Sequence, residues 1–360
     1  MFNAYRYQLS FKQPFVTGAG TFRHRQGLIL RYHDSETDSI SEAAPLPGFS
    51  NESLSDTIKV LTVKRQSTLS FFSDPFDLQT LALFTDSYSD FPALQCAISM
   101  LGLQILADRN EKPVSDLLDR PAEKSLKLNA VAGYSDPQDL KSSVTSLYEE
   151  GFRVFKCKVP SDPGYLPDAL SGLSATFSDI SFRLDANRSW PGKDVTRFTK
   201  QFSHLPIEYL EEPTMLHNAG EFSRMAENSV LPLAADESIL QFGFDSLADL
   251  SSPPDYYILK PMFLGNLINL FATIDRRNHL VNSVIFTTAL ESAVGRRIVA
   301  RIAGMYGSPK AAHGLNTGTL FKDDLTADNP ITGGHYNLDG IPEEFITFGS
   351  LNTELLEPLF

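Results

Sequence analysis

Two lysines close together in the sequence are the feature of this chain most suited to chemistry. Lys156 and Lys158 lie in a mostly apolar run, residues 152–159, whose composition is typical of a strand. Side chains alternate along a strand, so both ammonium groups are expected on one face. Crowded like charges need a ligand, carboxylates or a chemical task to compensate them, and crowding lowers the pKa of a lysine toward that of a useful base. We therefore predict a lysine base in this run.

Three acidic residues follow at regular intervals. Asp185, Glu211 and Asp236 are spaced by about 25 residues, roughly one strand-and-helix unit each. Neighbouring carboxylates repel one another, and Mg²⁺ removes that cost while leaving positions open for the oxygens of a ligand. Any one of these acids alone is explained more simply as the N-cap of a following helix. Three such acids at matching strand ends, beside two lysine positions, instead predict a site for Mg²⁺, in which Mn²⁺ could substitute.

A second lysine position lies beyond the acids. Lys260 follows Asp236 by a further unit, so Lys158 and Lys260 should approach a metal-bound ligand from opposite sides. A lysine base beside a metal suggests removal of a proton next to a carboxylate, because the cation stabilises the enediolate that results. A surface lysine before Pro261 is the plainer interpretation of Lys260, but its position at the end of an apolar strand favours the functional one.

Eight short apolar segments between residues 126 and 329 alternate with helical stretches, which predicts a closed (β/α) barrel. In such a barrel the carboxyl ends of the strands meet at one mouth, where the residues above converge. Helices are expected at Pro137–Glu150 and Gly265–Arg277, and the patterns after Val159 and Asp236 are weaker. The expected strands are Leu126–Val131, Phe152–Val159, Ser181–Asp185, Ile207–Glu211, Leu233–Asp236, Tyr256–Lys260, Ser283–Thr288 and Ala311–Leu315.

The first 125 residues predict a separate α+β block. Gly27–Tyr32 alternates as a strand does, and Pro92–Arg109 has apolar residues at helical spacing. Val16–His24 and Glu42–Glu52 are polar and rich in turn-forming residues, so both are expected to be loops. Residues 330–360 return to strand-like sequence and are expected to rejoin this block.

The composition narrows the class of partner. A net charge of −13 and a pI near 5.0 disfavour nucleic acid and anionic membranes, and a small-molecule ligand fits better. Cys96 and Cys157 are too few for a disulfide framework and predict buried free thiols in a reducing compartment. No targeting segment or membrane span is apparent, so a cytoplasmic protein is expected. Oligomeric state is not set by the sequence.

Five short motifs in order resemble the enolase superfamily, in its muconate-lactonizing-enzyme-like subgroup. The matching segments are Lys156–Lys158 (Lys-x-Lys), Asp185–Asn187 (Asp-x-Asn), Leu210–Pro213, Asp236–Ser238 (Asp-Glu-Ser) and the opposing lysine, Lys260. The resemblance covers essentially the whole chain. It implies a modified (β/α)₇β barrel, residues 126–329, and an α+β capping domain, residues 1–125 completed by residues 330–360.

The resemblance also implies roles for individual residues. Lys158 would be the base, Lys156 the neighbour that lowers its pKa, and Lys260 the lysine on the opposite face. The implied metal ligands are Asp185, Glu211 and Asp236. Asn187 would support the ligands from behind, and Glu237 would be an ion-pair or orienting partner. The capping loops, with Gly18 and Phe49, would close over the substrate.

A later stretch narrows the resemblance within the subgroup. Thr288–Gly295 resembles the Ser-x-Glu-Ser-x-Gly stretch of the o-succinylbenzoate synthase family, and Gly314–Thr317 its Gly-Leu-Asp-Thr. Thr288 stands for the usual Ser and Asn316 for Asp. The implied reaction is a Mg²⁺-dependent syn dehydration of 2-succinyl-6-hydroxy-2,4-cyclohexadiene-1-carboxylate in menaquinone biosynthesis, with Ser292 and Thr288 holding the substrate.

Two alternatives stay open. One is a dipeptide epimerase or N-acylamino acid racemase of the same superfamily, in which both Lys158 and Lys260 transfer protons. The Asp-x-Asp element typical of dipeptide epimerases is missing between Ala311 and Phe321, which disfavours that alternative. The other is a non-catalytic barrel that binds carboxylates, with the lysines as electrostatic clamps.

Overall fold

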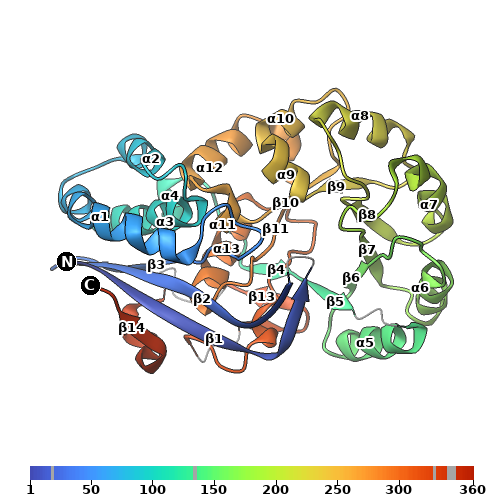
Figure 1. Ribbon diagram of the computed structural model, residues 1–360, viewed down its shortest axis with the longest axis horizontal. Helices are drawn as coiled ribbons and strands as arrows, with labels where there is room; N and C mark the ends of the chain where they lie inside the picture. Colours follow the sequence, from blue (N-terminus) through green and yellow to red (C-terminus); the bar gives the residue numbers. More distant parts are fainter. Residues whose placement is uncertain (18–19, 133–135, 327–329, 339–345) are drawn as a thin grey trace.

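Seven parallel strands curl around the centre of the molecule, with α5 to α8 along their outer side (Figure 1). The computed structural model describes residues 1–17, 20–132, 136–326, 330–338 and 346–360. The order in the parallel sheet is that of the sequence, from β5 to β11. Its strands are β5 (Asn129–Ala132), β6 (Val154–Lys158), β7 (Ser181–Asp185), β8 (Ile207–Glu211), β9 (Leu233–Ala235), β10 (Tyr256–Leu259) and β11 (Val284–Phe286).

Helices connect successive strands, including the two gaps where the sequence pattern was weak. Their bounds are α5 (Pro137–Glu149), α6 (Leu166–Thr176), α7 (Val195–Phe202), α8 (Ala219–Asn228), α9 (Glu237–Phe242), α10 (Phe244–Ala248), α11 (Pro261–Leu264), α12 (Leu267–Asp275) and α13 (Ala293–Tyr306). Short 3₁₀ turns lie at Gly192–Asp194, Asn278–Asn282, Gly318–Leu320, Phe348–Ser350 and Thr353–Leu355. This alternation is what the spacing of apolar segments predicts.

The eighth predicted strand, Ala311–Leu315, is not a regular strand. His313 forms a parallel bridge with Leu128 and Gly314 forms one with Thr287, so this segment joins the two edges of the sheet. Backbone hydrogen bonds of 2.7 Å from His313 to the Lys127 carbonyl and 3.0 Å from Gly314 to the Phe286 carbonyl hold the join. The barrel therefore closes through a short seam, because the segment is in contact with each neighbour for only about one residue.

The first predicted barrel strand, Leu126–Val131, is divided. β4 (Ser125–Lys127) pairs with β13 (His335–Asn337), which pairs with β12 (Ile331–Thr332), in a small antiparallel sheet. The division falls at Leu128, whose amide donates to the carbonyl of Gly334. The chain thus changes pairing partner at one residue, and apolar composition alone does not mark that change.

A four-stranded antiparallel sheet covers the other side of the molecule (Figure 1). Its order is β14-β1-β2-β3, so the C-terminal strand pairs with the N-terminal one. The bounds are β1 (Phe2–Thr17), β2 (Gly20–His33), β3 (Asp38–Ala43) and β14 (Leu356–Pro358), with helices α1 (Leu54–Ser73), α2 (Leu78–Asp86), α3 (Pro92–Arg109) and α4 (Val114–Leu117). The pairing of β14 with β1 agrees with the expectation that residues 330–360 rejoin the N-terminal block. The domain limits at residues 125 and 330 stay predictions.

The helix predicted at Pro92–Arg109 is confirmed residue for residue as α3. Its residues are buried continuously from Ala93 to Ala107, because it packs against β3 on one side and α11 and α12 on others. A helix that is buried on all sides is not expected to show one apolar and one polar face. This burial agrees with the position of α3 between the antiparallel sheet and the barrel.

Among the residues that the structure describes, none of the helices has the length and apolar character of a membrane span.

The loop predicted at Val16–His24 is wrong for most of its length. β1 continues to Thr17 and β2 begins at Gly20, and Val16 pairs with Thr21 across the hairpin. Both faces of this arm are largely exposed, so the strand carries no apolar alternation that the sequence would reveal. Gly18 lies outside the described residues.

Candidate active site

The carboxyl ends of five neighbouring strands, β6 to β10, bring the predicted residues to one mouth of the barrel. Lys158 ends β6 level with Asp185 at the end of β7, and Asp185 is level with Glu211 at the end of β8. Asp236 and Lys260 directly follow β9 and β10. Parallel pairing with nearly constant register therefore places at one edge residues that are far apart in the sequence.

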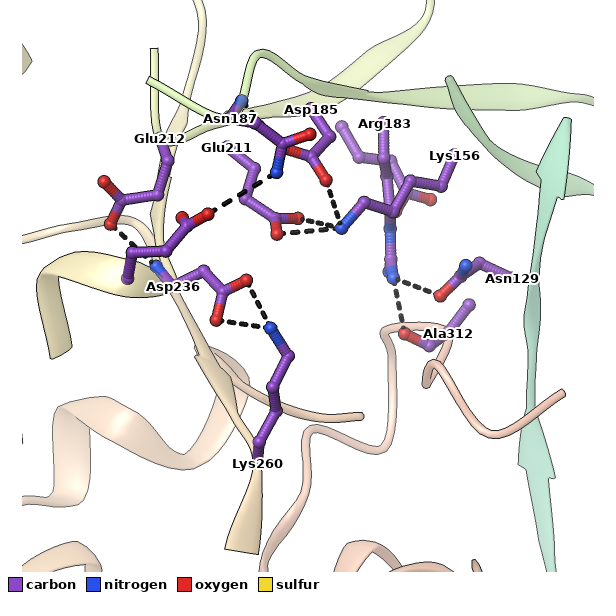
Figure 2. Close-up of polar contacts among 12 residues, drawn as sticks. Asn129, Lys156, Arg183, Asp185, Asn187, Glu211, Glu212, Asp236, Lys260 and Ala312 are labelled. Carbon is purple, nitrogen blue, oxygen red and sulfur yellow. Dashed lines mark hydrogen bonds and ion pairs between the residues drawn. The ribbon is translucent and has the colours of Figure 1, made fainter. Parts of the chain in front are cut away.

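Lys156 lies between two of the acids (Figure 2). Its Nζ donates to both carboxylate oxygens of Glu211 at 2.8 Å and is 2.9 Å from Oδ2 of Asp185. The side chain of Lys156 is 20% exposed, whereas Glu211 is fully buried. Burial alone would lower the pKa of Lys156, but Asp185 and Glu211 outweigh it and raise that pKa well above its usual value. At Lys156 the two carboxylates therefore determine the direction of the pKa shift, and the role predicted for Lys156 toward Lys158 stays a prediction.

Lys260 approaches from the other side of the acids (Figure 2). Its Nζ donates to Oδ1 of Asp236 at 2.7 Å and to Oδ2 at 2.5 Å. Burial opposes the charge of Asp236, but Lys260 and Lys156 outweigh it and lower the pKa of that carboxyl. Lys158 is exposed at the rim of the mouth. The two predicted lysine positions thus flank the acids, with Lys158 freely accessible from solvent.

The acids supply the right donor chemistry for Mg²⁺ without forming a ready-made metal cluster. Within the described ranges, no three acidic, histidine or cysteine side chains are arranged to hold a metal ion as they stand. Instead, the ammonium groups of Lys156 and Lys260 serve as counter-ions to the carboxylates. Burial, and then repulsion from Asp185, raises the pKa of Glu211 well above its usual value. Buried carboxylates from three adjacent strand ends are hard oxygen ligands, which fit Mg²⁺.

The residues predicted to support the acids contact one another. Nδ2 of Asn187 donates to Oε1 of Glu237 at 3.4 Å, and the backbone amide of Asn187 donates to Oδ1 of Asp185. Burial, and then repulsion from Asp236, raises the pKa of Glu237 to about 7. The described part of the chain offers Glu237 no ion pair, so the orienting alternative agrees better with its contacts than the ion-pair one.

Glu212 is a residue whose importance the sequence did not reveal. It is buried, and its Oε1 accepts hydrogen bonds from the backbone amides of Asp236 at 2.9 Å and Ser238 at 2.6 Å. Its Oε2 accepts from the Ser238 hydroxyl and from Arg188. Glu212 thereby fixes the turn that presents Asp236. The feature of the sequence that could have identified Glu212 is its position as a second acid directly after Glu211, at the end of a predicted strand.

Arg183 is a second residue that the prediction missed. It is fully buried on β7, and its Nε donates to Glu208 at 2.7 Å. Nη1 crosses to the barrel seam, where it donates to the Ala312 carbonyl at 2.7 Å and to Oδ1 of Asn129 at 3.2 Å (Figure 2). Arg183 lies two residues before Asp185, so strand alternation already places it on the inner face.

Two predicted substrate contacts have different surroundings. Thr288 is buried, and its hydroxyl is 2.8 Å from that of Thr317. Ser292 is fully buried; it caps α13, and its hydroxyl donates to Glu42 of β3. This geometry argues against the predicted contact between Ser292 and a substrate, because the hydroxyl proton is already used in the protein interior.

Phe49 is partly exposed in the loop after β3 and borders a cleft of about 430 Å³. Phe244 and Phe263 line the same cleft, and the amide of Phe263 donates to the carbonyl of Lys260. The cleft therefore opens beside the β10 end of the mouth. None of the three acids lines it.

His313 belongs to the barrel seam and not to the mouth. Its Nδ1 accepts from the amide of Phe286 at 3.1 Å, and Nε2 is 3.2 Å from the Ser308 carbonyl. These contacts require a neutral ring that is protonated on Nε2. Burial first, and the Arg183 cation second, lower the pKa of His313 to about 4.

We expect His313 to make the protein sensitive to mild acid. An unfolded histidine has a pKa near 6.5, so between about pH 6.5 and 4 the unfolded chain binds a proton that the folded chain does not. The stabilisation is complete above that window and is lost as the pH falls through it, by about 3 kcal/mol. Denaturant unfolding at a series of pH values should show this loss in the wild type and less of it in His313→Gln. His204→Gln, at an exposed position, is the control and should follow the wild type; a parallel profile for His313→Gln would contradict the prediction.

Comparisons with known proteins agree with this geometry. The family model "MenC, N-terminal domain" matches residues 1–73, and "Enolase C-terminal domain-like" matches residues 139–249. The o-succinylbenzoate synthase of Desulfotalea psychrophila is 24% identical over 356 residues, covering 91% of this chain and 96% of that protein. That of Aliivibrio fischeri is 27% identical over 335 residues, covering 91% and 93%. A dipeptide epimerase from Methylococcus capsulatus, solved with Mg and the dipeptide L-Arg-D-Lys, has a TM-score of 0.80 at 19% identity, covering 97% and 99%.

Proposed function

The chain belongs to the enolase superfamily, and from this premise we propose that it is an o-succinylbenzoate synthase, a Mg²⁺-dependent hydro-lyase. Its substrate would be a small carboxylate, 2-succinyl-6-hydroxy-2,4-cyclohexadiene-1-carboxylate. The observation that carries the proposal is the level placement of Lys158, Asp185 and Glu211 on adjacent strands, with Asp236 and Lys260 beyond them. Near full-length similarity to synthases from two organisms supports the choice of reaction.

The proposed reaction needs one base on one face of the substrate. Nζ of Lys158 takes the proton next to the carboxylate, and its ammonium form then gives a proton to the departing hydroxide, which leaves as water. The C–H and C–O bonds break on the same face, so one lysine serves both steps of a syn elimination. The exposed position of Lys158 at the mouth gives the substrate access to it.

Other side chains would hold charge instead of moving protons. Lys260, across the acids from Lys158, would stabilise the developing anion electrostatically. Lys156, bound to Asp185 and Glu211, would keep two carboxylates in place and remain an ammonium group. Asp185, Glu211 and Asp236 would hold Mg²⁺, which supplies concentrated positive charge beside the substrate carboxylate when bound. Asn187 and Glu237 would orient the acids from behind.

The decisive experiment follows the ultraviolet absorbance of the cyclohexadiene substrate with the purified protein. We expect Mg²⁺-dependent loss of that absorbance, and treatment with a chelator should stop it until Mg²⁺ or Mn²⁺ is restored. Intact substrate after long incubation with Mg²⁺ would contradict the proposal. The same outcome across a panel of carboxylates would support a non-catalytic carboxylate-binding barrel.

A racemase or epimerase is the second candidate, favoured by lysines on both sides of the acids. Such an enzyme would exchange the α-proton of either enantiomer of an N-acylamino acid or dipeptide with solvent deuterium. Exchange without dehydration activity would replace the synthase proposal, whereas both activities together would define a promiscuous enzyme. We also propose a cytoplasmic location, in keeping with the buried free thiols of Cys96 and Cys157.

A further inference from the structure

Arg25 is a buried cation of the antiparallel sheet with an unusual set of partners. It lies on β2 and is only 2% exposed. Among the described residues, its hydrogen-bond acceptors are five backbone carbonyl oxygens, without a carboxylate. Burying a guanidinium is costly unless its donors are satisfied, so this arrangement requires all of the carbonyls to stay in place.

Four of the five carbonyls belong to two loops that are far apart in the sequence, and the fifth is that of Gln26, next to Arg25 on β2. Nη1 donates to Pro45 at 2.7 Å and Nη2 donates to Ala44, both in the loop that follows β3, residues 44–53, here called the capping loop. Nε donates to Leu290 at 3.0 Å and Nη2 to Ala289 at 3.4 Å. These two residues lie in the loop between β11 and α13, residues 287–292, here called the seventh-strand loop.

Neighbouring contacts strengthen the connection. The amide of Ala44 donates to Sδ of Met262 at 3.3 Å, and Met262 lies just beyond Lys260. Glu42, on β3 just before the capping loop, accepts from the amides of Ser292 at 3.0 Å and Gly295 at 2.8 Å. The N-terminal end of the capping loop and the strand before it are thus attached to the barrel.

The seventh-strand loop has a conformation that needs support. Leu290 has a φ of +64°, in the left-handed region that a branched side chain adopts only at a cost of about 1 kcal/mol or more. Its carbonyl is the acceptor for Nε of Arg25. A strained backbone conformation persists only where surrounding contacts stabilise it, and the hydrogen bond from Arg25 stabilises it at Leu290 itself.

We propose that Arg25 is a positioning residue that makes the capping loop and the seventh-strand loop move as one unit. The capping loop lines the cleft beside the mouth, and the seventh-strand loop follows the end of β11. Their joint placement would therefore affect how a substrate fits at the mouth. The effect on turnover rests on the proposed synthase function, whereas the mechanical coupling of the loops does not. Only a planar fork reaches carbonyls in both loops at once, which a lysine cannot imitate.

The test compares Arg25→Lys and Arg25→Met with Arg31→Lys, a matched control on the same strand whose partner is the surface residue Asp38. For both Arg25 variants we expect kcat/KM to fall by about tenfold to a hundredfold, the cost of small misplacements of a bound substrate, with Mg²⁺ affinity unchanged. Hydrogen exchange should accelerate at 44–53 and 287–292 together and not in α5 or α6. Unchanged exchange at both loops, or a uniform increase that follows a lower Tm, would overturn the proposal.

Wild-type protein provides a test that needs no variant. We expect native-state hydrogen exchange at rising denaturant to give a common opening free energy for four amides, those of Phe49, Ser50, Ala289 and Ser292. The reason is that breaking the Arg25 contacts frees both loops in one opening. Separate opening free energies and separate denaturant slopes would overturn the coupling. If the wild type lacks synthase activity but the loops open together, only the proposed function fails.

Discussion

Replacing Lys158 by alanine is expected to abolish turnover while leaving the fold and Mg²⁺ binding intact. Lys158 ends β6 beside Asp185, and its exposed side chain contributes little to packing. General acid–base catalysis by a positioned group contributes roughly 10²- to 10⁴-fold, and one lysine here is proposed to carry both proton transfers. We therefore expect kcat to fall by about 10⁴-fold or more, as measured by the substrate absorbance assay, with an unchanged circular dichroism spectrum.

Lys141→Ala, an exposed lysine of α5, is the matched control and should retain wild-type kcat. Lys158→Arg keeps the positive charge but cannot release its proton near neutral pH, so it should be as inactive as the alanine variant. An arginine variant with substantial turnover would mean that Lys158 provides charge and not a base. Near-normal turnover in Lys158→Ala would refute the role altogether.

Replacing Asp236 by asparagine is expected to remove Mg²⁺-dependent turnover through loss of metal binding. Asparagine keeps the shape but removes the charge that faces Lys260 at 2.5–2.7 Å. Loss of a residue that merely supports a ligand costs about 10- to 100-fold in metal affinity, and loss of a ligand should cost more. Titration calorimetry with Mg²⁺, or the electron paramagnetic resonance signal of bound Mn²⁺, measures this without reference to activity.

Asp90→Asn, at an exposed position, supplies the control for charge removal and should bind Mg²⁺ as the wild type does. Lys260→Met in the Asp236→Asn background then separates two effects, because it removes the ammonium group left without its partner. If metal affinity returns in the double variant, Asp236 acts by neutralising Lys260 and not as a ligand. Wild-type affinity in Asp236→Asn itself would refute the ligand assignment.

Strand-end positions were predictable from sequence because they depend on local patterns. Asp185 and Glu211 end apolar runs, and parallel strands bring such ends to one edge whatever the details of packing. The pairing of Lys156 with both acids was not predictable, since it depends on side-chain directions across three strands. The inward direction of Arg183 could have been predicted, because side chains two residues apart on a strand share a face and Asp185 is on the inner one.

Contacts between the antiparallel sheet and the barrel were the least predictable part of the molecule. Ser292 stands directly before α13, where a serine cap is the ordinary expectation, but its burial beneath Glu42 joins residues 250 positions apart. A distant partner therefore decides the surroundings of Ser292, and a single sequence does not reveal it. The hairpin arm around Val16 was missed for a different reason: its pairing is local, but both strands are exposed there and leave no apolar pattern.

The short seam of the barrel has a consequence for synthesis on the ribosome. Arg183, in the middle of the chain, finds two of its acceptors in Asn129, encoded earlier, and Ala312, encoded much later. A nascent chain that ends at β11 lacks the Ala312 acceptor, and a buried guanidinium with an unmet hydrogen bond is costly. The ring is therefore completed only after residues 311–315 have emerged, so the barrel closes late in synthesis.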